Sequence, residues 1–268
     1  MWVKRAARPA LRSRLGFWLL AALARLTRRE ILRPRTNPGG PEGLRSEAEL
    51  LDRLRARGVH VPPVLGLAAD GSWLALGSLG ESLGSQLARL ADAGARRALL
   101  VAAARGLGEL HAQGFVHGAP LPRNLTASDR APERIGFLDF EDHTESRMRL
   151  ACAQARDLAL LLWGAARWAE RDGELLPAML AAWKAKAPDS AGEELAGLVR
   201  FARRCRAPLR PFLRWCGGDL RRASLALETL LRDERRSGSE APAPPRSEPP
   251  LGVGGGTPEG RPAAGEGF

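Results

Sequence analysis

The residues best suited to chemistry lie in one stretch, residues 111–143. His117 follows a segment with helical periodicity, Asn124 comes seven positions later, and Asp139 stands near the end of the apolar run IGFLDF. A carboxylate at the tip of a buried strand is costly unless it meets a cation. Amide and carboxylate oxygens are ligands that Mg²⁺ takes together with phosphate oxygens. The types and spacing therefore indicate a site for magnesium and phosphate at Asn124 and Asp139.

The same stretch resembles the phosphoryl-transfer motifs of kinases. Kinases carry His-Arg-Asp, then four residues, then Asn, and further on Asp-Phe-Gly. This chain has HGA at 117–119, four residues, Asn124, and then DFE at 139–141. The flanking patterns LHAQGFVHG and FLDFED are similar to bacterial lipopolysaccharide-core (Kdo/heptose) kinases and related kinase-like phosphotransferases.

That resemblance implies a role for each residue of the motif. Asn124 and Asp139 would hold Mg²⁺, and His117 would brace the loop that contains it. Asp157, in ARDLALLL, is similar to the helix aspartate that anchors this loop from behind in the family. The cofactors implied are ATP and Mg²⁺.

A lysine near the beginning of the chain extends the resemblance. Trp2-Val3-Lys4 resembles the end of the kinase VAIK strand, and the next lysine along the chain is Lys184. Lys4 would then contact the phosphates, with a helical glutamate as its partner. Glu47 lies on the leucine-rich face of the following helix and Glu49 on another face, which favours a Lys4–Glu47 pair. The alternative is an unrelated surface lysine and a glutamate in a capping turn.

Four departures from the family pattern stand beside the resemblance. Ala119 occupies the position of the catalytic aspartate, and alanine cannot accept a proton. The glycine-rich strand-turn-strand that covers phosphates does not precede Lys4, which predicts a truncated first lobe or a start codon assigned too late. Glu47 lies 43 positions after Lys4, which implies an inserted basic helix. Glu141 and Asp142 follow the DF pair, where they could bind a second metal, replace the base, or be solvated loop acids.

Hydrophobic periodicity and turn residues predict the elements that position these groups. The predicted strands and extended pieces are Trp2–Lys4, Val59–Val64, Ser72–Leu76, Phe115–Val116, Leu125–Thr126 and Ile135–Phe140. The predicted helices start at Ser46, as an N-cap, and end near Gly58, run from Ala91 to Gln113, and then dominate from Met148 to Arg235.

The order of these elements predicts the fold class. It is α+β, a protein-kinase-like two-lobed fold with a truncated N-terminal lobe at 1–90 and a mainly helical C-terminal lobe at 91–236. Residues 237–268 are rich in Gly and Pro and are predicted to be a disordered tail.

Composition sets the class of protein. At 268 residues and 44% hydrophobic, the chain is not wholly disordered. The net charge of +11 comes from arginine and indicates either an anionic partner or coding bias. Three widely spaced cysteines argue against a disulfide scaffold or a zinc site. The histidines show no metal-ligand spacing, and His111 is expected to be a hydrogen-bonded core residue.

No segment is long enough to span a bilayer, which fits a cytoplasmic protein. The apolar run at 15–24 is interpreted as an amphipathic helix, which either packs on its own domain or lies on the surface of the inner membrane. The basic stretch at 200–215 is interpreted as a solvated arginine face, although anionic lipid or nucleic acid is a second interpretation.

The sequence thus favours ATP- and Mg²⁺-dependent phosphoryl transfer to a hydroxyl, of a lipopolysaccharide-core sugar or another small molecule. The expected partners are nucleotide and a lipid-linked sugar or anionic membrane surface, without a specific nucleic acid. The first alternative is a pseudokinase that binds nucleotide or a partner without turnover. The second is a basic protein peripheral to membrane or nucleic acid.

Overall fold

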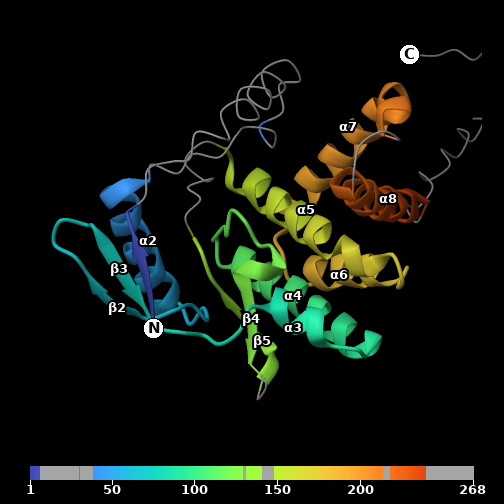
Figure 1. Cartoon of the computed structure of the whole chain (residues 1–268). Helices are drawn as coiled ribbons and strands as arrows, with labels where there is room; N and C mark the ends of the chain where they lie inside the picture. The colour runs from blue at the N-terminus through green and yellow to red at the C-terminus, as the bar shows by residue number, and fades with distance from the viewer. Residues whose placement is uncertain (7–29, 31–38, 129–130, 141–147, 214–217, 240–268) are drawn as a thin grey trace, which may run out of the picture.

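The chain is an α+β protein in which helices predominate and small antiparallel sheets accompany them (Figure 1). The computed structural model describes residues 1–6, 30, 39–128, 131–140, 148–213 and 218–239. The described elements are β1 (Trp2–Arg5), α2 (Gly40–Ala56), β2 (Val64–Leu67), β3 (Trp73–Leu76), α3 (Leu83–Arg89), α4 (Ala93–Ala112), a 3₁₀ turn (Pro122–Asn124), β4 (Leu125–Ser128), β5 (Ala131–Phe137), α5 (Leu150–Ala169), α6 (Leu175–Lys184), α7 (Asp189–Leu213) and α8 (Gly218–Ser239).

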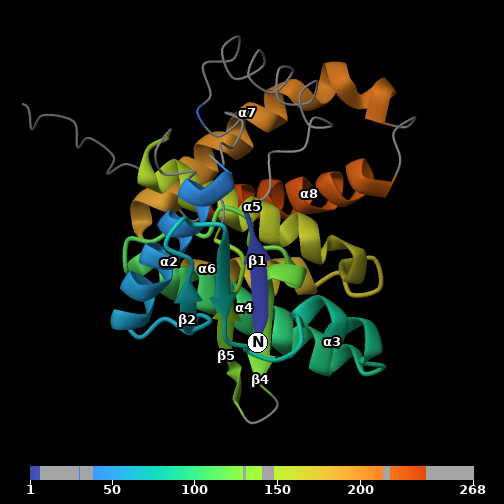
Figure 2. The ribbon, with the colours of Figure 1, turned by 60° about the vertical axis from the view of Figure 1, so that its left-hand side comes forward.

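The first sheet has the strand order β1-β3-β2, with β1 at one edge (Figure 2). Lys4 on β1 lies opposite Leu74 on β3 in the antiparallel register. Helix α2 contacts β2 and β3 through an apolar face that includes the buried Leu51 and Leu54. Glu47 shares this face and is itself buried. The first sheet and α2 therefore bring Lys4 and Glu47 together where the helix packs on the sheet.

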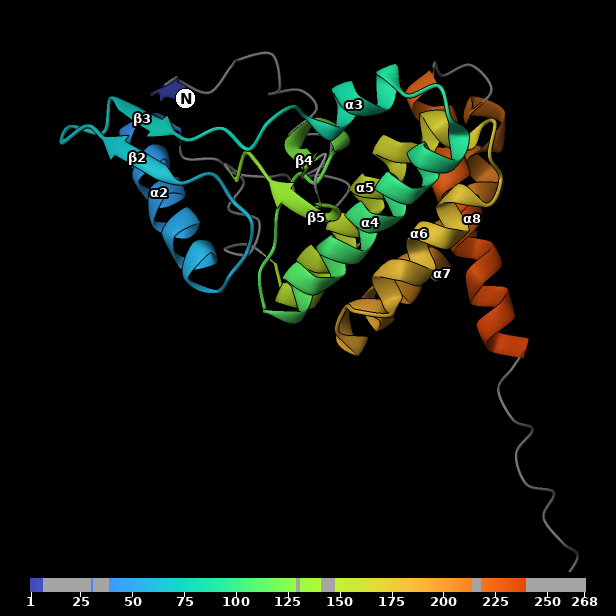
Figure 3. The ribbon, with the colours of Figure 1, turned by 90° about the horizontal axis from the view of Figure 1, so that it is seen from below.

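The second sheet is the hairpin β4-β5, which packs on α4 between the first sheet and the helices (Figures 1 and 3). Backbone hydrogen bonds connect it to the earlier part of the chain: the Phe137 N–H donates to the His60 carbonyl at 2.9 Å. An isolated bridge joins Ser82 to Thr126. The end of β5 is thereby fixed against the loop that follows α2.

Helices α4 to α8 form the remainder, with α7 and α8 at the end away from the first sheet (Figure 3). Close approach of α4 and α6 depends on Gly108, because a Cβ there would lie 2.8 Å from the Trp183 carbonyl oxygen. Helix α5 packs against α6, α7 and α8. One apolar core cluster joins α2, β3, β5 and these helices.

Several sequence predictions of element bounds need correction. Helix α2 begins at Gly40 instead of Ser46, with Pro41 in its first turn, a position where the missing N–H is harmless. The strand predicted at Val59–Val64 lies at Val64–Leu67, because Pro62 and Pro63 cannot donate to a ladder. Residues 115 and 116 are in no strand.

Two further corrections concern the segments around the motif. Strand β5 ends at Phe137 instead of Phe140. The Leu138 N–H still bonds to the opposite carbonyl, that of Asn124, but the Asn124 N–H bonds to the Leu121 carbonyl in the 3₁₀ turn, so the ladder goes no further. Helix α3 was not predicted; its signal is Ser82, whose hydroxyl accepts from the Ser85 N–H and caps the helix.

Some predictions concern residues that the structure does not describe. The amphipathic helix at 15–24 lies outside the described residues, as does most of the predicted tail, although α8 continues to Ser239. Across the part of the chain that is described, no helix has the length and apolar character needed to cross a membrane.

Candidate functional site

The centre of the candidate site is the ammonium group of Lys4. Its Nζ donates to Glu47 Oε1 at 2.7 Å and to Asp139 Oδ1 at 2.8 Å. The three residues come from β1, α2 and the segment after β5. The predicted Lys4–Glu47 pair is therefore formed, and Asp139 joins it.

Exposure differs across this cluster and defines its open side. The Glu47 side chain is 1% exposed, that of Lys4 25% and that of Asp139 43%. Lys4 is therefore supported from the α2 side and accessible from the side of Asp139. The Asp139 carboxylate therefore lies on the more exposed side of the ammonium group.

The charge of Lys4 follows from its surroundings. Burial alone would lower its pKa, but the Glu47 and Asp139 carboxylates outweigh that effect and raise it. The ammonium is thus charged at any physiological pH. Removing the lysine would break its ion pair with the buried Glu47, and breaking a buried pair typically costs about 3–5 kcal/mol.

Asp139 has a backbone conformation that is uncommon for a non-glycine residue. Its φ is +65°, the left-handed region, which a non-glycine residue adopts at a cost of about 1–3 kcal/mol. The preceding N–H, that of Leu138, donates to the Asn124 carbonyl at 2.8 Å. Asp139 therefore directly follows a residue held to Asn124, so the two motif segments meet as their spacing predicts.

Asn124 is buried and its amide is held in one orientation. Nδ2 donates to the Ala119 carbonyl at 3.0 Å. This bond leaves Oδ1 as the amide atom available to another group. An amide oxygen and a carboxylate fit Mg²⁺ when phosphate oxygens complete its shell. Within the described ranges, no group of three or more His, Cys, Asp or Glu side chains could hold a metal ion.

The loop at 117–119 is held from behind by Asp157, as the resemblance implied. The buried Asp157 carboxylate accepts from the His117 N–H at 2.7 Å and the Gly118 N–H at 3.0 Å. Gly164, on the same helix α5, lets this region pack closely, because a Cβ there would lie 2.8 Å from Pro122 Cδ. Helix α5 thereby positions the loop that ends at Asn124.

His117 connects this loop to the segment after β5. Its ring stacks on Phe140 with centroids 4.6 Å apart, and its Nδ1 accepts from the Ala119 N–H at 3.3 Å. Burial lowers the pKa of His117, although the Asp157 and Asp139 carboxylates oppose the shift. The ring is therefore neutral near pH 7 and acts as a packing element.

His111 is a core residue with both nitrogens bonded, which confirms the sequence interpretation. The Trp183 indole N–H donates to Nδ1 at 3.0 Å, so the proton lies on Nε2. Nε2 then donates to Asp157 at 3.3 Å. His111 thus adds a third hydrogen bond to the carboxylate that holds the loop.

Gln154 supports the loop, and the sequence did not predict this role. Gln154 on α5 donates to the carbonyls of His111 at 2.8 Å and Phe115 at 3.3 Å. It fixes the end of α4 and the start of the loop relative to α5. The available signal was its place three positions before Asp157 on an otherwise apolar helix face.

The remaining predicted site residues have different outcomes. Ala119 is buried and places only a methyl group at the position of the family's base. Glu141 and Asp142 lie outside the described residues, so their predicted roles stay predictions.

Comparisons with known proteins complete the description of the site. No protein-family model matches this chain, and no curated protein matches it. The resemblance to lipopolysaccharide-core kinases is therefore one of motif residues alone.

Proposed function

We propose that this protein catalyses ATP- and Mg²⁺-dependent phosphoryl transfer to a hydroxyl group. The observation that carries the proposal is the Lys4 ammonium shared between Glu47 and Asp139, at 2.7 Å and 2.8 Å. Strand β1, helix α2 and the segment after β5 meet at the Lys4 ammonium group, and the Asp139 carboxylate lies on its more exposed side. Such a cluster suits the polyphosphate of a nucleotide, because phosphoryl transfer depends mainly on positioning and charge neutralisation.

Each residue has a distinct part in this proposal. Lys4 would bind phosphate oxygens, and Glu47 would keep the ammonium in place. Asp139 and Asn124 would hold Mg²⁺, which supplies charge neutralisation on the phosphates when bound. Asp157 would keep the loop rigid through its bonds to the His117 and Gly118 N–H groups.

The acceptor is proposed by resemblance to the lipopolysaccharide-core kinases. Their motifs are similar to the stretch around 111–143, and a sugar hydroxyl, lipid-linked in a membrane envelope, is the corresponding acceptor class. The net charge of +11 suits a phosphorylated acceptor or an anionic surface.

The second candidate is a pseudokinase, and Ala119 is the observation that favours it. A general base typically contributes about 10²–10⁴-fold to the rate. The buried methyl group of Ala119 can neither take a proton nor orient a hydroxyl. Nucleotide binding would persist in that case, because Lys4, Asn124 and Asp139 do not depend on Ala119's side chain.

A phosphoryl-transfer assay separates the two candidates. The wild type, Ala119→Asp and Asp139→Ala are incubated with Mg·ATP and lipopolysaccharide-core sugars, and product is followed by mass spectrometry. We expect slow transfer by the wild type, faster transfer by Ala119→Asp, and none by Asp139→Ala. Equal background rates in all three would refute catalysis and leave the pseudokinase.

A further inference from the structure

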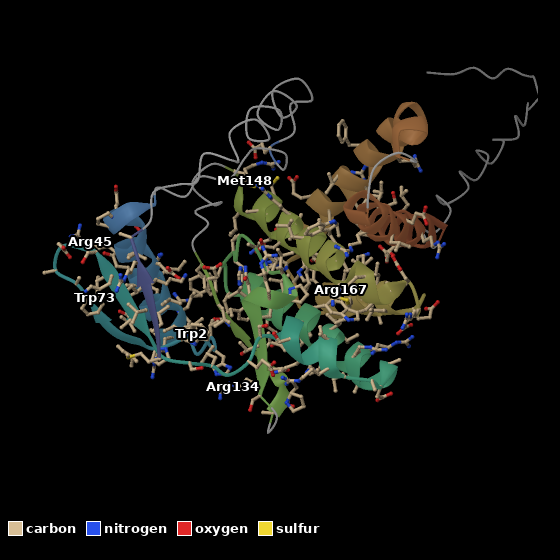
Figure 4. All side chains as sticks on the ribbon, in the orientation of Figure 1. Trp2, Arg45, Trp73, Arg134, Met148 and Arg167 are labelled. Atoms are coloured by element: carbon tan, nitrogen blue, oxygen red, sulfur yellow. The ribbon has the colours of Figure 1, made fainter. Side chains whose placement is uncertain are left out.

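A hollow of about 380 Å³ is lined by the loop that joins α2 to β2. Its described lining includes none of Lys4, Glu47 and Asp139. Its polar lining consists of Arg55, His60, Ser78 and Arg134, and no carboxylate lines it among the described residues. Arg134, labelled in Figure 4, belongs to β5. The apolar lining comes from four residues: Val59, Val61, Pro63 and Leu79.

The two arginines are available to a ligand. Among the described residues, neither Arg55 nor Arg134 has an ion-pair partner. A neighbouring hollow shares His60 and Arg134 but also contains Glu109 and Glu133. Two carboxylates therefore line the neighbouring hollow, whereas none is found in the described lining of the hollow that contains Arg55.

The His60 ring adds a donor. Its Nδ1 is buried without a hydrogen-bond partner and faces Gly136, where a Cβ would lie 3.2 Å from it. Thr126 Oγ1, also buried without a partner, faces the same glycine. His60 lines the hollow, and a neutral imidazole that carries its proton on Nε2 can donate it to a ligand there.

The Ser78 hydroxyl completes the donor set. Its oxygen accepts from the Gly80 N–H at 3.2 Å, so its own hydrogen remains available to a ligand. Two arginines, a histidine and a serine therefore line one space whose other walls are apolar. Guanidinium forks match the geometry of phosphate oxygens and bind them in pairs.

We propose that this hollow binds a small phosphate monoester that carries an apolar substituent. The phosphate would lie between Arg55 and Arg134, and the substituent would contact the valine and leucine side chains of the lining. The site is separate from the proposed nucleotide site, so its existence does not depend on phosphoryl transfer.

Imidazole NMR of the full chain tests the proposal, because the sequence contains only four histidines. Phenyl phosphate is the probe, and His60→Gln assigns the His60 signal. We expect a saturable shift of the His60 signal alone and a higher apparent pKa of His60, because a bound anion favours the charged ring. The core signals of His111 and His117 should stay unchanged, which reports an intact fold.

Variants and comparison ligands make the result decisive. Arg134→Gln should weaken phenyl phosphate binding by about tenfold or more, while the exposed Arg171→Gln should leave it unchanged. Phenol, which lacks the anion, should not shift the His60 signal. The absence of a His60 shift, or equal affinity in Arg134→Gln, would overturn the site, and equal affinity for benzoate would overturn its assignment to phosphate.

Discussion

At the scale of single residues, Asp157 holds more of the site than any other side chain described. Its buried carboxylate accepts two backbone N–H groups of the loop and the His111 Nε2–H. An amide in its place cannot accept from all three, because one of its two polar atoms is a donor. The loop that leads to Asn124 therefore depends on a negative charge buried in α5.

Asp157→Asn should lower the free energy of unfolding by at least about 2 kcal/mol, since it leaves buried donors unsatisfied. Asp233→Asn is the matched control, because Asp233 forms a partly exposed ion pair with Lys184 that is worth at most about 1 kcal/mol. Urea unfolding of both variants and the wild type measures the difference. Equal losses in the two variants would show that Asp157 does not hold the loop.

His117 makes stability depend on pH. Burial lowers its pKa from the ordinary 6.5, so below that pH the unfolded chain binds a proton that the folded chain does not. Stability is therefore complete above pH 6.5 and falls as the pH decreases toward the folded pKa. The pKa of His60 is also lowered by burial, so it contributes in the same direction.

In urea unfolding at a series of pH values, His117→Asn should show a shallower loss of stability below pH 6.5 than the wild type. A single proton contributes a slope of at most about 1.4 kcal/mol per pH unit. The slope is the readout, so a general destabilisation by the substitution does not obscure it. Parallel curves for the two proteins would mean that His117 titrates freely in the fold.

At the scale of elements, the contact of α4 with α6 determines how tightly the helices pack. Gly108→Ala should destabilise by about 1–3 kcal/mol, because its Cβ would lie 2.8 Å from the backbone oxygen of Trp183. Gly192→Ala in α7 is the control: nothing lies within 4 Å of its Cβ, so it should stabilise by up to about 1 kcal/mol. Thermal unfolding measures both. Opposite signs support the packing, and a neutral Gly108→Ala would contradict it.

The sequence predicted elements where the signal was local. Helix α4 and the face of α2 that carries Glu47 follow from apolar periodicity, which also favoured Glu47 over Glu49. That a helical glutamate pairs with Lys4 was implied by the resemblance to kinases, and the structure forms this pair. The start of α2 and the end of β5 were mispredicted, because a proline in a first turn decides the one and the bond from the Asn124 N–H to the Leu121 carbonyl decides the other. Neither contact is visible in a hydrophobic pattern.

At the scale of the whole molecule, the site exists only because distant segments meet. Lys4 and Asp139 are 135 positions apart, and their contact requires the first sheet to lie against the end of β5. The motif spacing predicted that Asn124 and Asp139 would lie close together, because both residue types suit a magnesium ion. The three-way contact at Lys4, the stack of His117 on Phe140 and the support from Gln154 depend on tertiary packing, which the sequence did not reveal.

Calorimetric titration of the full chain with Mg·ATP tests the central claim most directly. The wild type should bind with saturation, and Lys4→Ala should weaken binding by at least about tenfold, because the ammonium that meets the phosphates is lost. Lys186→Ala is the control, since that exposed lysine lies 3.7 Å from Glu109 and far along the chain from the cluster. Saturable binding that Lys4→Ala removes and Lys186→Ala preserves is the predicted result. Absence of binding by the wild type, or equal binding by all three proteins, would contradict a nucleotide site at Lys4.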